Sequence, residues 1–210
     1  WLVQLKTGNA GIVDTVLSFS FPVLATIYYS LSGGGSPRKI LVLMMVVIWG
    51  VRLALHLLVR TVGHKEDKRY TALREQWGNK QNILMLRFFY FQAILALVLS
   101  LPFALMMINP TSEITWLEWT GAAIWLIAVI GEATADSQLK KFISDPANKG
   151  KVCEKGLWYY SRHPNYFFEW LIWVAFFITS LSSPLGFLSV ICPVFMLYFL
   201  LKAWLRLILK

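Results

Sequence analysis

The segment SRHPNYFFEW brings polar side chains directly in front of a long apolar run. Pro164 suits the first position of a helix, where its missing N–H leaves no hydrogen bond unmade. Arg162, His163 and the free N–H groups of that helix start would form a corner that binds an anion such as phosphate. Asn165 and Glu169 are one turn apart and would share a face of the helix. The alternative, contact of Arg162 and His163 with lipid headgroups alone, does not account for that polar face.

Ionisable side chains also occur inside other apolar runs, where a charge costs on the order of 2.5–3.5 kcal/mol. Two groups of residues have the spacing of a single helical face. The first contains Trp49, Arg52, His56 and Arg60, and the second contains Glu132, Asp136 and Lys140. Such faces predict a polar cavity in a helical bundle. The alternative is that the charges pair with one another and only stabilise the bundle.

The composition indicates an integral membrane protein rather than a soluble domain. Of the 210 residues, 57% are hydrophobic and 15% are charged, and the mean hydropathy is +0.58. Several apolar runs reach the roughly 20 residues that cross a bilayer. Helices satisfy their backbone groups internally, and these runs do not alternate as barrel strands do. We therefore predict an all-α integral membrane protein.

The predicted architecture is a single domain over residues 1–210, a bundle of about six to seven transmembrane helices. The apolar runs that would span the membrane are residues 10–30, 40–62, 88–107, 116–138, 166–181 and 185–207. Turn-forming segments separate several of them, namely SGGGSPRK, NPTSE and SSPLG. Because the first residue is Trp1 rather than Met, we interpret the N-terminus as processed or trimmed.

The distribution of basic residues predicts the orientation in the membrane. They concentrate in the second and fourth connections between the apolar runs. These are Lys65, Lys68, Arg69, Arg74, Lys80, Lys140, Lys141, Lys149, Lys151 and Lys155. The positive-inside rule places both connections and both termini in the cytoplasm. This distribution explains the net charge of +9 by a membrane partner, and we expect no nucleic acid.

The second connection contains EDKRYTALREQWG, in which Tyr70, Leu73 and Trp77 are spaced as on one face of a helix. This spacing predicts a short amphipathic helix at the membrane interface. A solvated basic loop is an equally compatible interpretation. Cys153 and Cys192 stand in unrelated contexts, so neither a disulfide nor a thiolate metal site is expected. No metal-ligand spacing and no nucleotide-binding glycine motif occurs.

The segment KGLWYYSRHPNYFFEW resembles the C-terminal signature of the membrane steroid 5-alpha-reductase family, and it is close to that of the sterol C14 and delta-7 reductases. GEATADSQLKKF resembles the end of the preceding helix in that family. HKEDKRYTALREQWG and LRFFYFQ are similar to its bacterial branch. The resemblance covers most of the chain from Trp49 onward and is most specific in the first segment.

The resemblance implies an NADPH-dependent oxidoreductase that reduces the C=C bond of a lipid enone such as a 3-oxo-delta-4 steroid. It also implies that NADPH binds in a cytoplasm-facing cavity, whose cationic loops suit its phosphates. By position in the matching motifs, the cofactor contacts would be Asp136, Arg162, His163, Asn165 and Tyr166. Weaker candidates for the same cavity are Arg60, Arg69, Arg87, Glu132 and Lys140.

Enone reduction needs hydride transfer to the β-carbon and an acid that hydrogen-bonds the carbonyl as enolate charge develops. The family uses an acidic residue in an early helix, for which Asp14 is the nearest candidate, and a tyrosine in the next. Trp49 stands where that tyrosine is expected, and an indole N–H donates a hydrogen bond but supplies no proton. Tyr28 or Tyr166 could take the role. Glu169 is the acid of the C-terminal motif and completes the catalytic set.

Two other functions remain open on the sequence. Isoprenylcysteine carboxyl methyltransferases, which use S-adenosylmethionine, share the Arg-His-Pro before a tyrosine but usually carry a small residue in place of Asn165. A transporter or scaffold would use the buried charges only for pairing. Phe168 stands where the reductases carry a small residue, so it would narrow the approach to the nicotinamide. We expect a bacterial inner membrane, with the endoplasmic reticulum as the alternative, while the lipid and the oligomeric state are not specified.

Overall fold

The computed structural model describes residues 1–208, and it describes side chains up to residue 202. Within this part of the chain all regular structure is helical, which confirms the all-α prediction. The chain divides into two compact units, Trp1–Ile108 and Asn109–Lys210. Each unit is described by itself, and the single domain over residues 1–210 stays a prediction.

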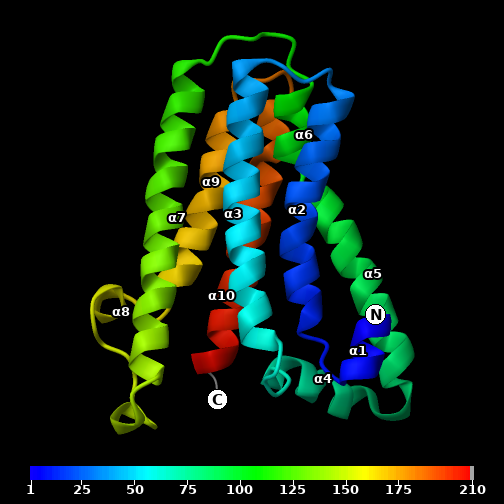
Figure 1. Cartoon of the computed structure of the whole chain (residues 1–210), viewed down its shortest axis with the longest axis vertical. Coiled ribbons are helices and arrows are strands. Elements are labelled where there is room, and N and C mark those ends of the chain that lie inside the picture. Colours follow the sequence, from blue (N-terminus) through cyan, green and yellow to red (C-terminus); the bar gives the residue numbers. More distant parts are fainter. Residues whose placement is uncertain (209–210) are drawn as a thin grey trace. The chain divides into compact units, whose positions relative to one another are not determined.

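The first unit is built on two long antiparallel helices, α2 and α3, which lie side by side in Figure 1. Its helices are α1 (Leu2–Thr7), α2 (Ile12–Leu31), α3 (Pro37–Thr61), α4 (Lys68–Trp77), α5 (Gln81–Leu99) and α6 (Leu101–Met107), with a 3-10 turn at Gly78–Lys80. The apolar run predicted at residues 88–107 is therefore wrong in its boundaries. It starts earlier, in α5, and Ser100 separates α5 from α6 just before Pro102.

Local sequence sets where α3 begins and how closely it packs on α2. The Ser36 hydroxyl accepts a hydrogen bond from the backbone N–H of Lys39 at 3.3 Å, and Pro37 occupies the first turn. A serine cap of this kind contributes about 1 kcal/mol. Farther along α3, Gly50 faces Pro22 so closely that an added Cβ would lie 2.6 Å from the proline ring. A larger residue at position 50 would force the two helices apart.

Residues 68–77 form the amphipathic helix α4, so the interpretation as a solvated loop is wrong. The Asp67 carboxylate caps α4 by accepting the backbone N–H of Arg69 at 2.9 Å. Tyr70 is buried on the inner face of α4, and Leu73 and Trp77 pack beside it. The cluster is completed by Ala10, Val13, Met85, Phe88 and Phe89. Apolar packing on α5 and the start of α2 therefore holds α4 in place.

The second unit is built on another antiparallel pair, α7 and α9 (Figure 1). Its helices are α7 (Trp116–Ile143), α8 (Leu157–Tyr160), α9 (Pro164–Ser180) and α10 (Ile191–Ile208), with 3-10 turns at Pro146–Asn148 and Gly186–Val190. Thr115 and Glu118 form a capping box at the start of α7, in which the Thr115 N–H donates to the Glu118 carboxylate at 2.7 Å.

Two glycines allow α7 and α9 to approach closely. A Cβ at Gly121 would collide with the Thr179 side chain and would lie 2.9 Å from the carbonyl oxygen of Ala175. A Cβ at Gly131 would overlap the ring of Phe168. Phe168 thus packs over a glycine of the neighbouring helix, which explains how a bulky ring fits at this position.

Three helical segments are long and apolar enough to cross a bilayer, judged by length and composition: α2, α3 and Lys68–Met107. Gly186–Lys202 is a shorter apolar helix. The helices α7 and α9 are not among these three candidates, and α9 has only 17 residues. The helices are consistent with a membrane protein, whereas the number of six to seven spans and the membrane orientation stay predictions.

Candidate functional site

The predicted site residues divide between the two units. The first unit contains Asp14, Tyr28, Trp49, Arg60, Arg69 and Arg87. The second contains Glu132, Asp136, Lys140, Arg162, His163, Asn165, Tyr166 and Glu169. The second set comes from α7, α9 and the connection between them, so its members can be related to one another directly.

Hydrogen bonds to α7 position the connection that leads to the SRHPN motif. The indole N–H of Trp158 donates to the carbonyl oxygen of Ala135 at 2.9 Å, and this bond is buried. The backbone N–H of Leu157 donates to the Gln138 side chain, also at 2.9 Å. Gly156 has a φ of +60° and lies against Gln138, so a side chain at position 156 would be strained. These contacts hold α8 on α7 immediately before the motif.

The motif starts α9 as the sequence predicts. Pro164 occupies the first turn and His163 is the N-cap residue, but the His163 side chain makes no capping hydrogen bond. The hydroxyl of Ser161 instead accepts the backbone N–H of His163 at 3.2 Å. The imidazole stacks on the ring of Tyr166, with ring centroids 5.0 Å apart and planes inclined by 15°. The His163 ring therefore lies along the first turn of α9.

Asn165 links α9 to the polar face of α7. Its side-chain N–H donates to the carboxylate of Asp136 at 3.3 Å, and its carbonyl oxygen accepts the N–H of Tyr166 at 3.1 Å. Along α7, Glu132 is 4% exposed, Asp136 is half-buried and Lys140 is exposed. Glu132, Asp136 and Lys140 therefore share one face of α7, and their exposure to solvent increases from Glu132 to Lys140.

Glu169 follows Asn165 by one turn on α9, as the spacing predicts. Its carboxylate accepts the indole N–H of Trp173 at 3.1 Å, and Trp173 is almost fully buried. This bond gives the N–H of a buried indole a hydrogen-bond acceptor. A catalytic role for Glu169 stays a prediction.

Two hollows lie on either side of the segment that precedes α9. One, of about 440 Å³, is lined by Trp158, Tyr160, Ser161 and Arg162 among others. The second has a volume of about 170 Å³, with Ser161, His163 and Tyr166 at one end. The remaining wall of the smaller hollow is apolar, formed by Phe167, Trp170, Leu197, Leu200 and Leu201. The larger hollow is lined by both Arg162 and Glu154, and it shares Ser161 with the apolar hollow as a common border.

The electrostatics of this corner favour a neutral histidine beside available cations. Burial lowers the pKa of His163, and the positive charge of Arg162 lowers it further. A neutral imidazole donates from one ring nitrogen and accepts at the other. Arg162 and Lys140 are both exposed, and neither has an ion pair in the part of the chain that the structure describes. The corner can therefore offer positive charge to a ligand.

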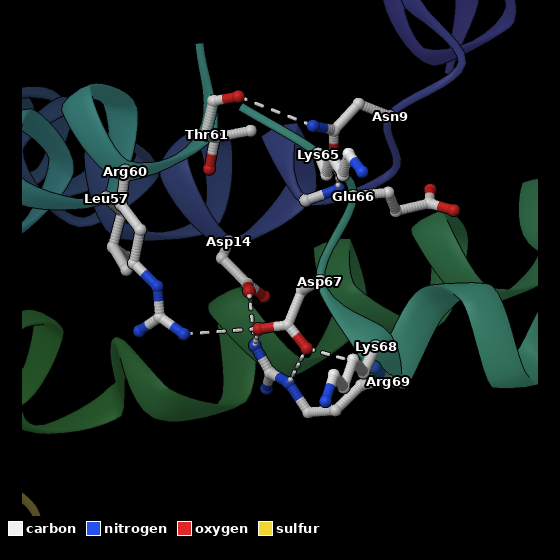
Figure 2. Close-up of a pocket in the computed structure, with 11 residues that line it drawn as sticks. Asn9, Asp14, Leu57, Arg60, Thr61, Lys65, Glu66, Asp67, Lys68 and Arg69 are labelled. Atoms are coloured by element: carbon white, nitrogen blue, oxygen red, sulfur yellow. Dashed lines mark hydrogen bonds and ion pairs between the residues drawn. The ribbon is translucent and has the colours of Figure 1, made fainter. Parts of the chain in front are cut away.

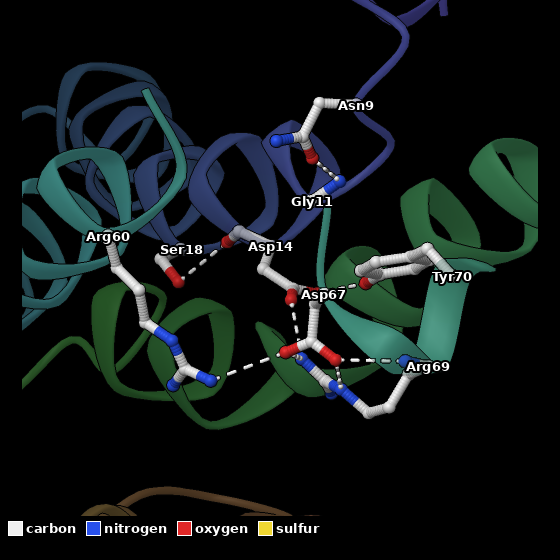
Figure 3. Close-up of polar contacts among 8 residues, drawn as sticks. All are labelled: Asn9, Gly11, Asp14, Ser18, Arg60, Asp67, Arg69 and Tyr70. Atoms are coloured by element: carbon white, nitrogen blue, oxygen red, sulfur yellow. Dashed lines mark hydrogen bonds and ion pairs between the residues drawn. The ribbon is translucent and has the colours of Figure 1, made fainter. Parts of the chain in front are cut away.

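In the first unit, Asp14 belongs to a network of polar contacts with α4 (Figure 3). The Tyr70 hydroxyl donates to Asp14 Oδ1 at 2.6 Å, and an Nη of Arg69 lies 3.2 Å from Asp14 Oδ2. Arg69 also pairs with Asp67 at 3.1 Å, and Arg60 lies 3.3 Å from the same carboxylate. Asp14 is thus a hydrogen-bonding and ion-pairing partner of α4, and its catalytic role stays a prediction.

These side chains surround a pocket of about 370 Å³ where α2 begins and α3 ends, shown in Figure 2. Burial alone would raise the pKa of Asp67, but the hydrogen bonds and positive charge of Arg69, together with the charge of Arg60, outweigh it and lower the pKa. Asp67 therefore remains ionised through the ordinary pH range. Arg87, predicted for the same cofactor, is an exposed residue of α5.

Two of the predicted catalytic residues of the first unit, Asp14 and Tyr28, lie far apart on the same helix. Asp14 and Tyr28 are fourteen positions apart on α2, which corresponds to about 21 Å along a helix. The Tyr28 hydroxyl is hydrogen-bonded to the Ser100 hydroxyl at 2.8 Å. Trp49 is completely buried, and its indole stacks on Phe21 with ring centroids 5.4 Å apart. Asp14 and Tyr28 therefore cannot act together on one carbonyl group.

Several residues in and beside the Asp14 network were not among the predicted site residues. Asp67 occupies the position before an amphipathic helix, where aspartate is a favoured N-cap, so this signal was available. Glu66, Arg74 and Gln4 were not predictable in the same way. Arg74 donates to Glu66 at 3.0 Å and to the buried Gln4 side chain at 2.6 Å. The hydrogen bond between Arg74 and Gln4 joins residues that lie seventy positions apart.

The fold and the site describe an all-α protein with candidate membrane-spanning helices and a polar corner at the start of α9. Residues 1–205 match the family described as DUF1295, a protein of unknown function, and the chain belongs to that family. No curated protein matches the chain, and no solved structure matches it. The family description specifies no chemistry, so the function has to be argued from the side chains.

Proposed function

We propose that the protein is an NADPH-dependent membrane reductase that reduces the C=C bond of a lipid enone. The observation that carries the proposal is the corner at the start of α9. There, the Asp136–Asn165 hydrogen bond of 3.3 Å lies in a unit that also presents the cations Arg162 and Lys140, which have no ion pair among the described residues. The resemblance of this segment to the steroid 5-alpha-reductase signature points to the same chemistry.

The residues of the corner fit a cofactor that carries several phosphates. A guanidinium forms strong charge-assisted hydrogen bonds with phosphate oxygens, and Arg162 lines, together with Glu154, a hollow of about 440 Å³. This volume falls in the usual range for ligand pockets, about 300–1,000 Å³. Asn165 and Asp136 would bind polar groups of the cofactor, and Lys140 would add positive charge. When bound, NADPH would supply the hydride for the β-carbon of the enone.

The lipid would approach along the apolar wall of the smaller hollow. The donor that polarises its carbonyl is best sought there, because Asp14 is already paired and Tyr28 bonds Ser100. Tyr166 lines this hollow and stacks on His163, whose lowered pKa keeps the imidazole neutral. We assign Tyr166 as the hydrogen-bond donor to the developing enolate and His163 as the residue that orients it.

The test is NADPH binding to the detergent-solubilised chain, measured by titration calorimetry for the wild type and for Asn165→Ala. Loss of a hydrogen-bonding partner in a polar site costs about 1–3 kcal/mol, so we expect affinity to fall roughly 10- to 100-fold. Asn79→Ala is the matched control, because Asn79 is exposed on the 3-10 turn after α4. Wild-type protein that binds no NADPH would rule out the reductase.

S-adenosylmethionine is titrated in parallel because the Arg-His-Pro of residues 162–164 is also typical of isoprenylcysteine carboxyl methyltransferases. Saturable binding of S-adenosylmethionine alone, lost in His163→Ala, would assign the protein to that methyltransferase type. If neither compound binds and Asn165→Ala only lowers the unfolding temperature, the polar corner is structural. Each outcome selects one of the three functions.

A further inference from the structure

The pocket of about 370 Å³ in the first unit is lined by more cationic side chains than carboxylates. Its carboxylates are all matched by donors within the unit. Glu66 accepts the Arg74 guanidinium at 3.0 Å and the Ala10 N–H at 2.7 Å. Asp14 and Asp67 are matched by Arg69 and Arg60, as described above. Every carboxylate of the lining therefore already has a partner, and none is left to pair with the remaining lysines of the lining.

Two cations in the same lining remain available. Lys65 and Lys68 line the pocket and are exposed, and in the described residues neither ammonium has an ion pair or a hydrogen bond. Lys68 is also the first residue of α4, where backbone N–H groups and the helix dipole add positive potential. Figure 2 shows both lysines at the pocket, together with Arg69 and Arg60. The pocket therefore carries an excess of positive charge that a bound anion would neutralise.

We propose that this pocket binds a phosphate group, held mainly by Lys65 and Lys68. The volume accommodates a phosphate together with the group that bears it. Two candidate membrane-spanning helices meet at the pocket, since α2 begins there and α3 ends there. Headgroup phosphates of phospholipids lie at the ends of such helices, and soluble nucleotides also present phosphates. Only the nucleotide source rests on the proposed reductase function.

The test uses the full chain with two phosphate-bearing probes. Phosphatidylglycerol is titrated into the detergent-solubilised protein and counted by native mass spectrometry, with phosphatidylcholine as the comparison lipid. Adenosine 2′,5′-bisphosphate is titrated as the soluble probe and followed by calorimetry. The variant Lys65→Ala/Lys68→Ala is compared with Lys149→Ala/Lys151→Ala, which removes the same charge from exposed lysines of the second unit.

Each basic residue near a lipid surface contributes about fivefold to binding of an anionic lipid. We therefore expect the Lys65/Lys68 variant to bind one probe about 30-fold more weakly, while the Lys149/Lys151 control keeps wild-type affinity. Lys65→Arg/Lys68→Arg should retain binding, because it keeps both charges.

The affected probe identifies the source of the phosphate. Selective loss of phosphatidylglycerol binding assigns the pocket to a lipid headgroup, and selective loss of the bisphosphate assigns it to a nucleotide. Equal affinities in the two double variants for both probes would overturn the proposal, since net charge alone would then explain any binding. This result would not affect the reductase proposal, which is tested separately by NADPH binding and by its loss in Asn165→Ala.

Discussion

The two charged regions of the chain use their ionisable groups in different ways. In the first unit, each carboxylate of the Asp14 network has at least one cationic or hydroxyl partner within 3.3 Å. In the second unit, Arg162 and Lys140 are exposed, and neither has an ion pair in the described part of the structure. The sequence alone does not distinguish these regions, because both show acids and bases at helical spacing.

The difference separates charges that stabilise the fold from charges that are available to a ligand. Arg69 and Arg60 lower the pKa of Asp67, and the largely buried pair of Arg74 and Glu66 is costly to disturb. A solvated cation costs the fold little and remains able to bind a phosphate. Matched substitutions in the two units test this distinction, because the same change should affect stability in one unit and ligand binding in the other.

The largest effect is expected for Arg74→Ala. Arg74 and Glu66 have side chains that are 19% and 12% exposed, and removing one partner of such a pair leaves a poorly solvated charge. We expect a loss of about 3–5 kcal/mol in the free energy of unfolding in detergent micelles. Arg162→Ala should change it by about 0.5 kcal/mol or less while weakening NADPH binding. Similar losses of stability for both variants would contradict the comparison.

A smaller effect is expected for Tyr70→Phe, which removes only the hydroxyl that donates to Asp14 at 2.6 Å. Hydrogen bonds to charged groups contribute about 1.5–3 kcal/mol, so the unfolding free energy should fall by roughly that amount. Tyr166→Phe is the counterpart in the second unit. It should leave stability nearly unchanged and lower the rate of enone reduction, because it removes the proposed carbonyl donor.

The pH dependence of stability should differ between the units. Because the pKa of Asp67 is lowered in the folded state, its contribution is complete above its ordinary value of 3.8 and is lost as the pH falls through the folded-state pKa. Asp67→Asn keeps an N-cap but removes the charge, so its unfolding temperature should depend less on pH in this acidic range.

For His163 the lowered pKa also favours the deprotonated form, and its contribution is present above the ordinary value of 6.5 and lost below it. The unfolding temperature of His163→Gln should therefore depend less on pH just below 6.5 than that of the wild type. In the acidic range where Asp67 titrates, the two proteins should show the same pH dependence. An identical profile for His163→Gln and wild type would mean that the imidazole titrates as a solvated group.

The smallest effect is expected for Arg60→Gln. The Arg60 side chain is 66% exposed and its pair with Asp67 measures 3.3 Å. Surface pairs of this kind contribute about 0–1 kcal/mol and are screened by salt. The difference between Arg60→Gln and wild type in denaturant titrations should disappear at high salt. A larger, salt-independent loss would mean that Arg60 belongs to the buried part of the network.

Short-range patterns in the sequence predicted the local structure well. The apolar runs identified an all-α fold, and the proline after His163 identified the start of α9. The spacing of Tyr70, Leu73 and Trp77 identified α4 as a helix. Each prediction depends on interactions within a few residues, which are encoded by helical periodicity and by backbone chemistry.

Contacts between distant residues were decided only by the tertiary structure. The sequence grouped Asp14 with Tyr28 and Trp49, whereas folding pairs Asp14 with Tyr70 and Arg69, more than fifty positions away. Helical spacing determines which side chains share a face, but not which face of another helix they meet. That choice is set by packing, here by the apolar cluster that holds α4 against α5 and the start of α2. The tertiary structure therefore decided that Asp14 pairs with α4, while Arg162 and Lys140 are exposed and have no ion pair among the described residues.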